Sequence, residues 1–201
     1  MKTYLSKVKS RITISLFIFI LLTSPVLAQS FDFNSSTTGN GTPEITQVKE
    51  GNIISVKSEC VNLCLKSVAG EPSAYTGFTG DVVTTNNDCI KELTLSLTNG
   101  DFFNLNSIDI QERHCSSLDL VFTAKSGSEL KGSVTIHFNP SEGKSIDFSA
   151  NAVFKNITSI EITTSTKDAC CGDYTYWIAL DNVVISNVHQ QQISSIGLHI
   201  R

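Results

Sequence analysis

Basic residues are scarce in this chain. It has 15 Lys and Arg against 19 Asp and Glu in 201 residues, and four of the basic ones lie within the first eleven positions, at Lys2, Lys7, Lys9 and Arg11. The part that follows position 28 therefore has 11 basic and 19 acidic residues, a formal net charge of −8. Because nucleic-acid binding depends on Lys and Arg that neutralise phosphates, this balance argues against a nucleic-acid partner.

Only one long apolar run is present, and it lies near the N-terminus. The run Ile14–Leu22 follows a basic stretch that ends at Arg11 and precedes a segment of small residues that ends at Ala28. This pattern is typical of a removable export signal, and the run is too short for a stable membrane-spanning helix. We therefore expect a signal peptide at 1–28, a secreted or extracellular chain, and no membrane span after signal removal; association with the cell surface stays open.

Motifs of hydrolytic and nucleotide-dependent enzymes are missing. The sequence has no Gly-x-Ser-x-Gly, no His-Glu-x-x-His, no Gly-rich phosphate loop and no EF-hand loop. Asp109 and Glu112 are three residues apart, which places them on opposite faces of an extended strand and makes them a poor pair of catalytic carboxylates. A nucleophilic site made of His114 and Cys115 would need Cys115 as a free thiol, and an exported chain with an even number of cysteines argues against one. We name no catalytic residue.

All six cysteines follow the predicted signal peptide. Exported chains meet oxidising conditions, and an even number of cysteines fits a set of disulfides. Among the possible pairings we favour Cys89 with Cys115, since each closes a polar segment beside a strand-like run. The adjacent Cys170 and Cys171 would point to opposite faces of a strand, which favours separate partners over a ring, and the spacing matches no compact zinc site. The cysteines predicted to form disulfides are Cys60, Cys64, Cys89, Cys115, Cys170 and Cys171.

No stretch after the leader has the 3.6-residue period of a helix. Apolar and polar residues alternate instead, as Leu93, Leu95 and Leu97 do with the residues between them, and such alternation predicts β-strands. We expect strands at 30–33, 53–57, 61–67, 93–97, 102–110, 118–122, 134–138, 145–148, 157–164 and 174–186. So many short strands predict an all-β fold, an antiparallel two-sheet jelly-roll β-sandwich over residues 29–187 with a C-terminal tail at 188–201.

Turn signals and a change of parity refine this expectation. Asn99-Gly100 predicts a two-residue hairpin turn, and Ser126-Gly127 predicts a second hairpin. The apolar alternation runs through odd-numbered positions up to Leu105 and through even-numbered positions from Ile108, and this change predicts a bulge between them. Residues 70–88 are punctuated by Gly, Pro and Asn and are expected to be loop.

The single tryptophan lies in the segment Tyr174–Ile185. Aromatic side chains on a sandwich face or in its loops can stack on sugar rings. We therefore name Tyr174, Tyr176 and Trp177 as candidate ligand-binding residues. The parity of Trp177 favours a core position for it, whereas the two tyrosines lie nearer to the polar cysteine-containing loop and are better placed for exposed contact.

Asp181 and Asn182 interrupt an otherwise apolar strand. Buried polar groups need partners, and carboxylate and amide oxygens are the ligands of hard cations such as Ca²⁺. Asp32 could join them if the first and last strands are neighbours. The alternative is that Asp181 and Asn182 bond the backbone at a bulge. The candidate metal ligands are Asp32, Asp181 and Asn182, and the cation would be a structural Ca²⁺.

Four segments together carry a resemblance to a known group of folds. They are Phe31–Phe33, Leu97–Ile110, Phe154–Ile162 and Ala179–Ile185. This spaced pattern resembles jelly-roll modules of secreted bacterial proteins, similar to the galactose-binding-like and carbohydrate-binding-module superfamilies. The resemblance implies a β-sandwich, a carbohydrate ligand and a structural calcium site to which the closing Asp181 belongs.

The C-terminal tail carries a second resemblance. Ile193–Ile200 is similar to the lead-in to the sorting domain of type IX secretion cargo, and the Tyr-Pro-Asn-Pro element that would follow is absent before Arg201. We therefore leave open that this is a truncated form of a longer cargo protein.

Together these features predict a secreted, non-catalytic module that binds carbohydrate or another extracellular surface ligand. Such binding needs only a stiff scaffold with a few suitable side chains. Two alternatives stay open: a small glycan lyase or hydrolase on the same fold, and a structural or adhesive module without a small ligand.

Overall fold

A computed structural model describes residues 27–33, 42–59, 65–69, 81–85, 90–113, 116–166 and 175–190. These residues form twelve β-strands and one short 3-10 helix, η1 (Ala152–Phe154). The first sheet contains β1 (Gln29–Phe31), β4 (Leu65–Ala69), β5 (Asp81–Thr85), β7 (Phe102–Glu112), β10 (Gly143–Asp147) and β12 (Ile178–His189). The second sheet contains β2 (Glu44–Lys49), β3 (Asn52–Ser58), β6 (Leu93–Leu97), β8 (Leu118–Ser126), β9 (Glu129–Phe138) and β11 (Ser159–Thr164).

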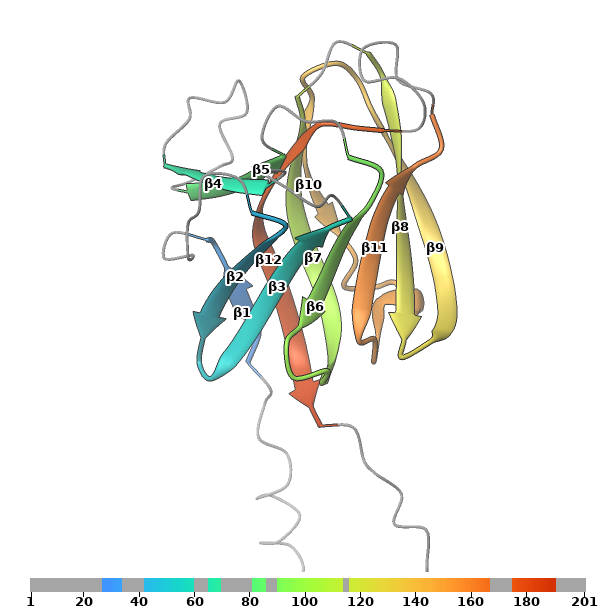
Figure 1. The fold of residues 1–201 in the computed structure, drawn as a ribbon. Helices are drawn as coiled ribbons and strands as arrows, with labels where there is room; N and C mark the ends of the chain where they lie inside the picture. The colour runs from blue at the N-terminus through green and yellow to red at the C-terminus, as the bar shows by residue number, and fades with distance from the viewer. Residues whose placement is uncertain are drawn as a thin grey trace, which may run out of the picture.

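The two sheets pack face to face (Figure 1). The first has the strand order β10-β7-β12-β5-β4, with β1 also paired to β12, and the second has the order β2-β3-β6-β11-β8-β9. Every strand pairing is antiparallel. The predicted jelly-roll β-sandwich is therefore confirmed. Within the described residues, no helix is long and apolar enough to cross a membrane.

The core follows from the alternation seen in the sequence. Leu93, Leu95 and Leu97 are buried, while Thr94 and Ser96 between them point away from the core. Aromatic rings fill the space between the sheets: the ring centroid of Phe148 lies 5.4 Å from that of Phe122 and 4.3 Å from that of Phe154. Burial of each such large side chain contributes about 1.5–3 kcal/mol to the free energy of folding, so these rings stabilise the packing of the two sheets.

Two of the predicted local features are confirmed. β8 and β9 form the hairpin expected around Ser126-Gly127. The bulge between Leu105 and Ile108 is also present, because the pairing of β7 with β12 shifts register on both sides of Val184. The shift lets Leu105 and Ile108 both reach the core although they are three positions apart, an odd spacing that a regular strand would place on opposite faces.

Other expectations were wrong. Asn99-Gly100 does form a tight turn, with Gly100 N donating to Leu97 O at 3.0 Å and φ of +76° at Gly100, but it links β6 in one sheet to β7 in the other and makes no hairpin. β6 already pairs with β3 and β11, so the chain must cross to the other sheet. The sequence pattern also missed β2 and placed β5 in a loop-rich stretch. β4 begins at Leu65, inside the strand expected at 61–67, and ends two residues beyond that range.

The first and last strands are neighbours. β1 pairs with β12 so that Gln29 lies opposite Ile185 and Phe31 opposite Val183. The described chain therefore begins and ends at the same end of the sandwich. β12 continues to His189, two residues past the predicted end of the domain.

Candidate functional site

The outer side of the paired strands β7 and β12 is polar. Ile108, Ile110 and Leu180 belong to the core, so the residues that alternate with them point outwards. Most of these outward residues are half-buried and carry amide, hydroxyl or carboxylate groups. We call this surface the asparagine face; it consists of Asn104, Asn106, Ser107 and Asp109 of β7, Asn182, Ser186 and Asn187 of β12, and Asn156 from the turn before β11.

Hydrogen bonds join the asparagine face across three segments of the chain. Ser186 Oγ donates to Asn106 Oδ1 at 3.2 Å, which links β12 to β7. Asn156 connects to both strands, because its backbone N–H donates to Asn104 Oδ1 at 2.9 Å and its Oδ1 accepts from Asn187 Nδ2 at 3.3 Å. These bonds hold the amide groups in fixed positions on the surface.

Three of the asparagines also meet a backbone requirement. Asn156, Asn182 and Asn187 have φ values of +50°, +47° and +53°. This left-handed region is unfavourable for most residues, and asparagine enters it more readily than other side chains except glycine. The irregular backbone at these positions therefore explains why asparagine recurs here, and it makes them poor choices for substitution.

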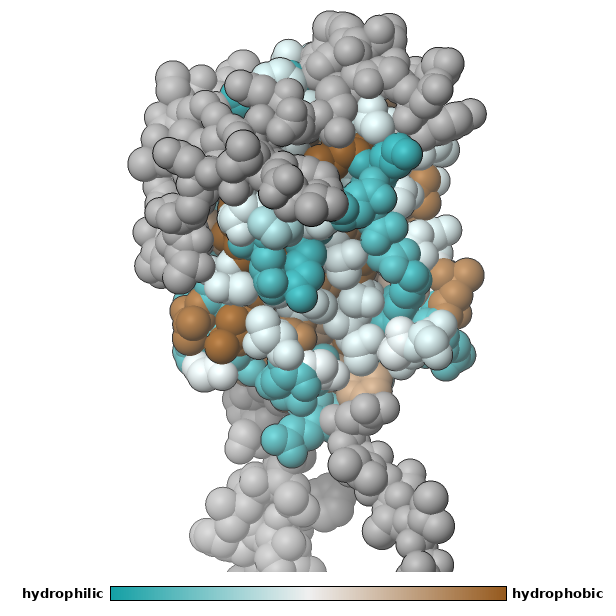
Figure 2. Space-filling model, viewed as in Figure 1, coloured by the Kyte–Doolittle hydropathy of each residue, from teal (hydrophilic) through white to brown (hydrophobic). Residues whose placement is uncertain are grey.

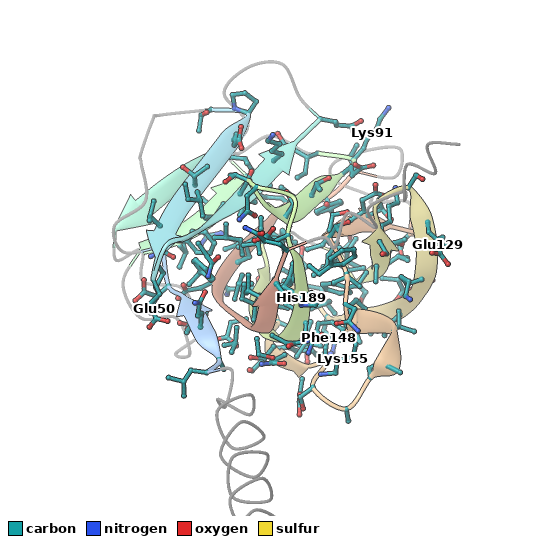
Figure 3. All side chains as sticks on the ribbon, turned by 90° about the horizontal axis from the view of Figure 1, so that it is seen from below. Glu50, Lys91, Glu129, Phe148, Lys155 and His189 are labelled. Atoms are coloured by element: carbon teal, nitrogen blue, oxygen red, sulfur yellow. The ribbon has the colours of Figure 1, made fainter. Side chains whose placement is uncertain are left out.

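An aromatic pair closes one end of the face. Phe102 and His189 are register partners at one end of the β7–β12 ladder, and their rings stack with centroids 5.4 Å apart and planes inclined by 17°. His189 is exposed, Phe102 is half-buried, and His189 Nδ1 lies 2.8 Å from Asn187 O. In Figure 3, which is seen from below, His189 is labelled on β12. The pair offers a flat apolar surface next to the amide groups.

Carboxylates lie towards the other end of the face. Asp109 on β7 is directly opposite Asp181 on β12 and opposite Ser145 on β10. Asp109 Oδ2 accepts a hydrogen bond from Asn182 Nδ2 at 2.9 Å, and Asp181 Oδ1 accepts from the backbone N–H of Asn182 at 2.7 Å. Asp181 is fully buried, whereas Asp109 is half-buried and can meet a ligand.

The chemistry of this surface suits a ligand with many hydroxyl groups. Each amide side chain offers both a donor and an acceptor, and each serine hydroxyl can do either. A sugar hydroxyl likewise donates and accepts, and the C–H faces of a sugar ring pack on aromatic rings. The asparagine face therefore combines, on one side of one sheet, hydrogen-bonding amides and hydroxyls with an apolar ring surface.

Of the predicted aromatic ligand residues, Tyr176 and Trp177 are not part of the asparagine face. Tyr174 lies outside the described residues. Tyr176 is fully buried, and its hydroxyl donates to Ile162 O in the core, so its predicted exposed contact is wrong. Burial raises the pKa of Tyr176 well above its ordinary value of 10.0. Trp177 is half-buried rather than a core anchor, and the Arg113 guanidinium carbon lies 5.8 Å from the centroid of its ring.

The candidate metal ligands are only partly brought together. The first and last strands are neighbours, as this site requires, but the Asp32 carboxylate accepts from Gln47 Nε2 at 2.8 Å and Asn182 gives its amide group to Asp109. Asn182 lies in the bulge, and Asp181 bonds its backbone, which is the arrangement of the alternative explanation. Within the described ranges, no three His, Cys, Asp or Glu side chains gather around one point. The oxygen donors fit Ca²⁺ in kind, and the metal site stays a prediction.

Other residues considered from sequence are placed as follows. Asp109 points outwards and Glu112 is fully buried, with its Oε2 accepting from Ser141 N at 2.6 Å, so the two carboxylates lie on opposite sides of the sheet as expected. His114 and the six predicted disulfide cysteines lie outside the described residues, and the disulfides stay a prediction.

The asparagine face left a weak signal in the sequence. Asn104 and Asn106 alternate with apolar residues of β7, and Ser186 follows the same parity on β12. The sequence analysis used the parity of β7 only to predict a bulge. Nothing in the sequence shows that Asn156 joins them, because it lies 52 residues after Asn104 and meets it only in the folded sandwich.

The outer side of the second sheet has a different character. Figure 2 shows this side, which is covered mainly by hydrophilic and near-neutral residues with small, separate apolar patches. Ion pairs lie on it between Lys125 and Glu161 and between His137 and Asp119, where Nδ1 and Oδ1 are 2.7 Å apart. Most of its charged groups therefore already have partners within the sheet.

Comparison with known proteins supports the fold. No family model and no curated protein matches the sequence. The crystal structure of a DUF4465 family protein from Bacteroides caccae is similar, with a TM-score of 0.51 and 11% identity, over 79% of this chain and 98% of that chain. A DUF4465 family protein from Bacteroides ovatus matches with a TM-score of 0.41, 9% identity and coverage of 82% and 100%. A family 11 carbohydrate-binding module from Clostridium thermocellum, in complex with a β-1,3-1,4-mixed-linked tetrasaccharide, matches with a TM-score of 0.40, 16% identity and coverage of 84% and 100%.

Proposed function

We propose that this chain is a secreted, non-catalytic module that binds carbohydrate through the asparagine face. The observation that carries the proposal is the hydrogen-bonded set of amides on the outer side of β7 and β12, with Phe102 and His189 stacked at its end. Amides that are already held in place lose little conformational freedom when a ligand binds, which favours affinity. Secretion is supported by the leader pattern at 1–28 and by the resemblance of the sequence to secreted modules.

A non-catalytic role fits the arrangement of carboxylates. Glycoside hydrolysis requires two carboxyl groups about 5–10 Å apart that flank the scissile bond. Asp109 and Glu112, the pair considered from sequence, lie on opposite sides of the sheet, and Glu112 is fully buried. Asp109 and Glu112 therefore do not form a hydrolytic pair, and the incubation experiment below tests the other carboxylates of the face.

The proposal is tested by screening the mature chain on a glycan array and measuring affinity for the strongest hits by calorimetry. Asn106→Ala removes one amide that is not in a left-handed backbone position, and we expect it to weaken binding about two- to twelvefold, as for loss of one hydrogen bond. Thr135→Ala is the matched control, because Thr135 is exposed on β9 of the second sheet. Absence of any glycan hit for the wild type would favour a structural or adhesive module.

Hydrolysis is tested in the same samples. Chromatography of each bound oligosaccharide after prolonged incubation should show the starting material unchanged. Shorter products that disappear with the Asp109→Asn variant would establish the enzyme alternative instead.

A further inference from the structure

The asparagine face has negative charge at the end away from Phe102 and His189. Asp109 and Ser145 are register partners, and Asp147 lies two residues beyond Ser145 on the same edge strand. Asp109 and Asp147 therefore lie diagonally across two neighbouring strands, a relationship in which residues are about 7–8 Å apart. Two carboxylates that are open to solvent therefore border the amides on this side.

The nearest partners of Asp109 do not neutralise it. Its Oδ2 accepts from the neutral amide of Asn182 at 2.9 Å, and directly opposite lies a second carboxylate, that of the buried Asp181. A positive group on the open side of Asp109 would therefore find a carboxylate whose hydrogen-bond donor is neutral.

The second carboxylate contributes less. Hydrogen bonds from Ser149 to Asp147, at 2.7 Å for the backbone N–H, lower the pKa of Asp147, and Lys155 lowers it further through its charge. Asp147 therefore already has a cation in electrostatic range, whereas Asp109 has a neutral donor. Asp109 is the residue at which a charged group on the ligand would matter most.

Resting on the proposed carbohydrate binding, we propose that Asp109 makes the asparagine face prefer glycans with free amino groups. An ammonium group supplies three donors and one positive charge, and the acceptors next to Asp109 are the hydroxyl of Ser145 and the amide oxygens of the face. Charge-assisted hydrogen bonds are about twice as strong as neutral ones. Uronic acids and sulfated sugars would be repelled at the same place, so the charge sets specificity as well as affinity.

The test uses three hexasaccharides with one backbone. The β-1,4-linked hexamers of glucose, N-acetylglucosamine and glucosamine differ only at the second carbon of each ring, which carries hydroxyl, acetamide or ammonium. Calorimetry at about pH 5 in the presence of EDTA keeps the amines protonated and removes divalent cations. We expect the glucosamine hexamer to bind the wild type about fivefold more tightly than the glucose hexamer, as for one exposed charge pair, with a smaller difference in high salt.

Asp109→Asn should abolish this preference, which is measured in each protein as the ratio of its affinities for the glucosamine and glucose hexamers. Asparagine retains an oxygen that can accept from Asn182, so the fold should persist, and equal melting temperatures check this. Glu129→Gln is the control: Glu129 is an exposed carboxylate on the edge strand β9 and, in Figure 3, lies well away from His189. It lowers the net negative charge equally but should leave the preference intact.

The outcomes separate the two proposals. If the glucose and N-acetylglucosamine hexamers bind and glucosamine gains nothing, or if the gain survives in Asp109→Asn, the inference is wrong while carbohydrate binding stands. If the control removes the gain as well, the preference comes from overall charge and the inference is also wrong. If none of the three hexamers binds, the inference is wrong and the glycan array alone decides on carbohydrate binding.

Discussion

Phe102 and His189 lie opposite one another at the end of the longest strand pairing in the first sheet, and their rings stack with centroids 5.4 Å apart. The pairing is separated from Ser186 and Asn104 by a register shift, which occurs where Asn187 adopts a φ of +53°. The bulge therefore turns His189 towards Phe102 at the end of β12. The irregular backbone at Asn187 thus lies next to the stacked rings of Phe102 and His189.

Replacement of Phe102 by alanine should weaken glycan binding without unfolding the protein. The ring is half-buried and stacks on an exposed histidine, so its loss costs less than loss of a core phenylalanine, about 1 kcal/mol or less of the free energy of unfolding. Loss of the stacking surface should reduce affinity for the best array hit about tenfold, or about 1.4 kcal/mol, which is more than most interface residues contribute. Calorimetry and a thermal melt measure the two effects separately.

The control for this variant is Leu130→Ala, which removes a side chain that is 63% exposed on β9. It should change neither affinity nor melting temperature appreciably. Equal affinities of Phe102→Ala and wild type would show that the ligand does not use this end of the asparagine face.

The positions of many strands could be predicted because burial leaves a period of two in the sequence. Leu93, Leu95 and Leu97 show this in β6, and the parity change between Leu105 and Ile108 correctly indicated a bulge. β5 was missed, since its short apolar stretch lies among Gly and Asn residues that indicate a loop. Local pattern thus reports the burial of a residue and is silent about its partner strand.

The candidate site was only partly predicted because the local sequence does not show which strands pair with one another. Asn99-Gly100 has the chemistry of a hairpin turn, yet the chain crosses to the other sheet there because β6 already has two neighbours. The asparagine face depends on the same long-range information, since β7, β12 and the turn at Asn156 come together only through the sheet order. Tyr176 was misplaced for a related reason: its isolated bridge to Ile90 carries it into the core.

We predict that all six cysteines form disulfides in the mature protein. The described residues that flank them meet at one end of the sandwich: Ser58 lies opposite Leu93, Ile90 opposite Tyr176, and Glu112 opposite Ile178. Disulfides between loops at one end would constrain the unfolded chain and stabilise the fold by about 2–4 kcal/mol each. Alkylation without reduction, followed by peptide mass spectrometry, should find no labelled cysteine and should report whether Cys89 pairs with Cys115; a labelled cysteine in the purified secreted protein would contradict full pairing.

The predicted calcium site at Asp32, Asp181 and Asn182 can be tested by chelation, which should lower the melting temperature of the protein. A cation that binds only the folded state stabilises it by mass action, by about 2.7 kcal/mol at a concentration of a hundred times its dissociation constant. Wild type should therefore melt several degrees lower in EGTA than in millimolar CaCl₂. Asp181→Asn keeps an acceptor for Asn182 N and should lose most of this calcium dependence. Identical melting of the wild type in the two buffers would leave the bulge as the whole explanation for Asp181.

Tyr176→Phe should destabilise the fold without changing ligand affinity. The variant removes the hydrogen bond from the buried hydroxyl to Ile162 O and leaves that carbonyl without this donor. The expected cost is about 1–2 kcal/mol in the free energy of unfolding, measured by urea titration near pH 7. A loss of glycan affinity with unchanged stability would instead restore the role predicted for Tyr176 from sequence.

The same variant should change the dependence of stability on alkaline pH. Burial raises the pKa of Tyr176 in the folded protein well above its ordinary value of 10.0. Because the folded state keeps this proton where the unfolded state releases it, the stabilising contribution is complete below about pH 10 and declines as pH rises further. Wild type should lose up to about 1.4 kcal/mol per pH unit more than Tyr176→Phe above pH 10, the limit for one proton. Urea titrations of both proteins at pH 9, 10 and 11 measure the difference, in which the other titrating groups cancel; parallel curves would mean that the Tyr176 hydroxyl reaches water in the folded state.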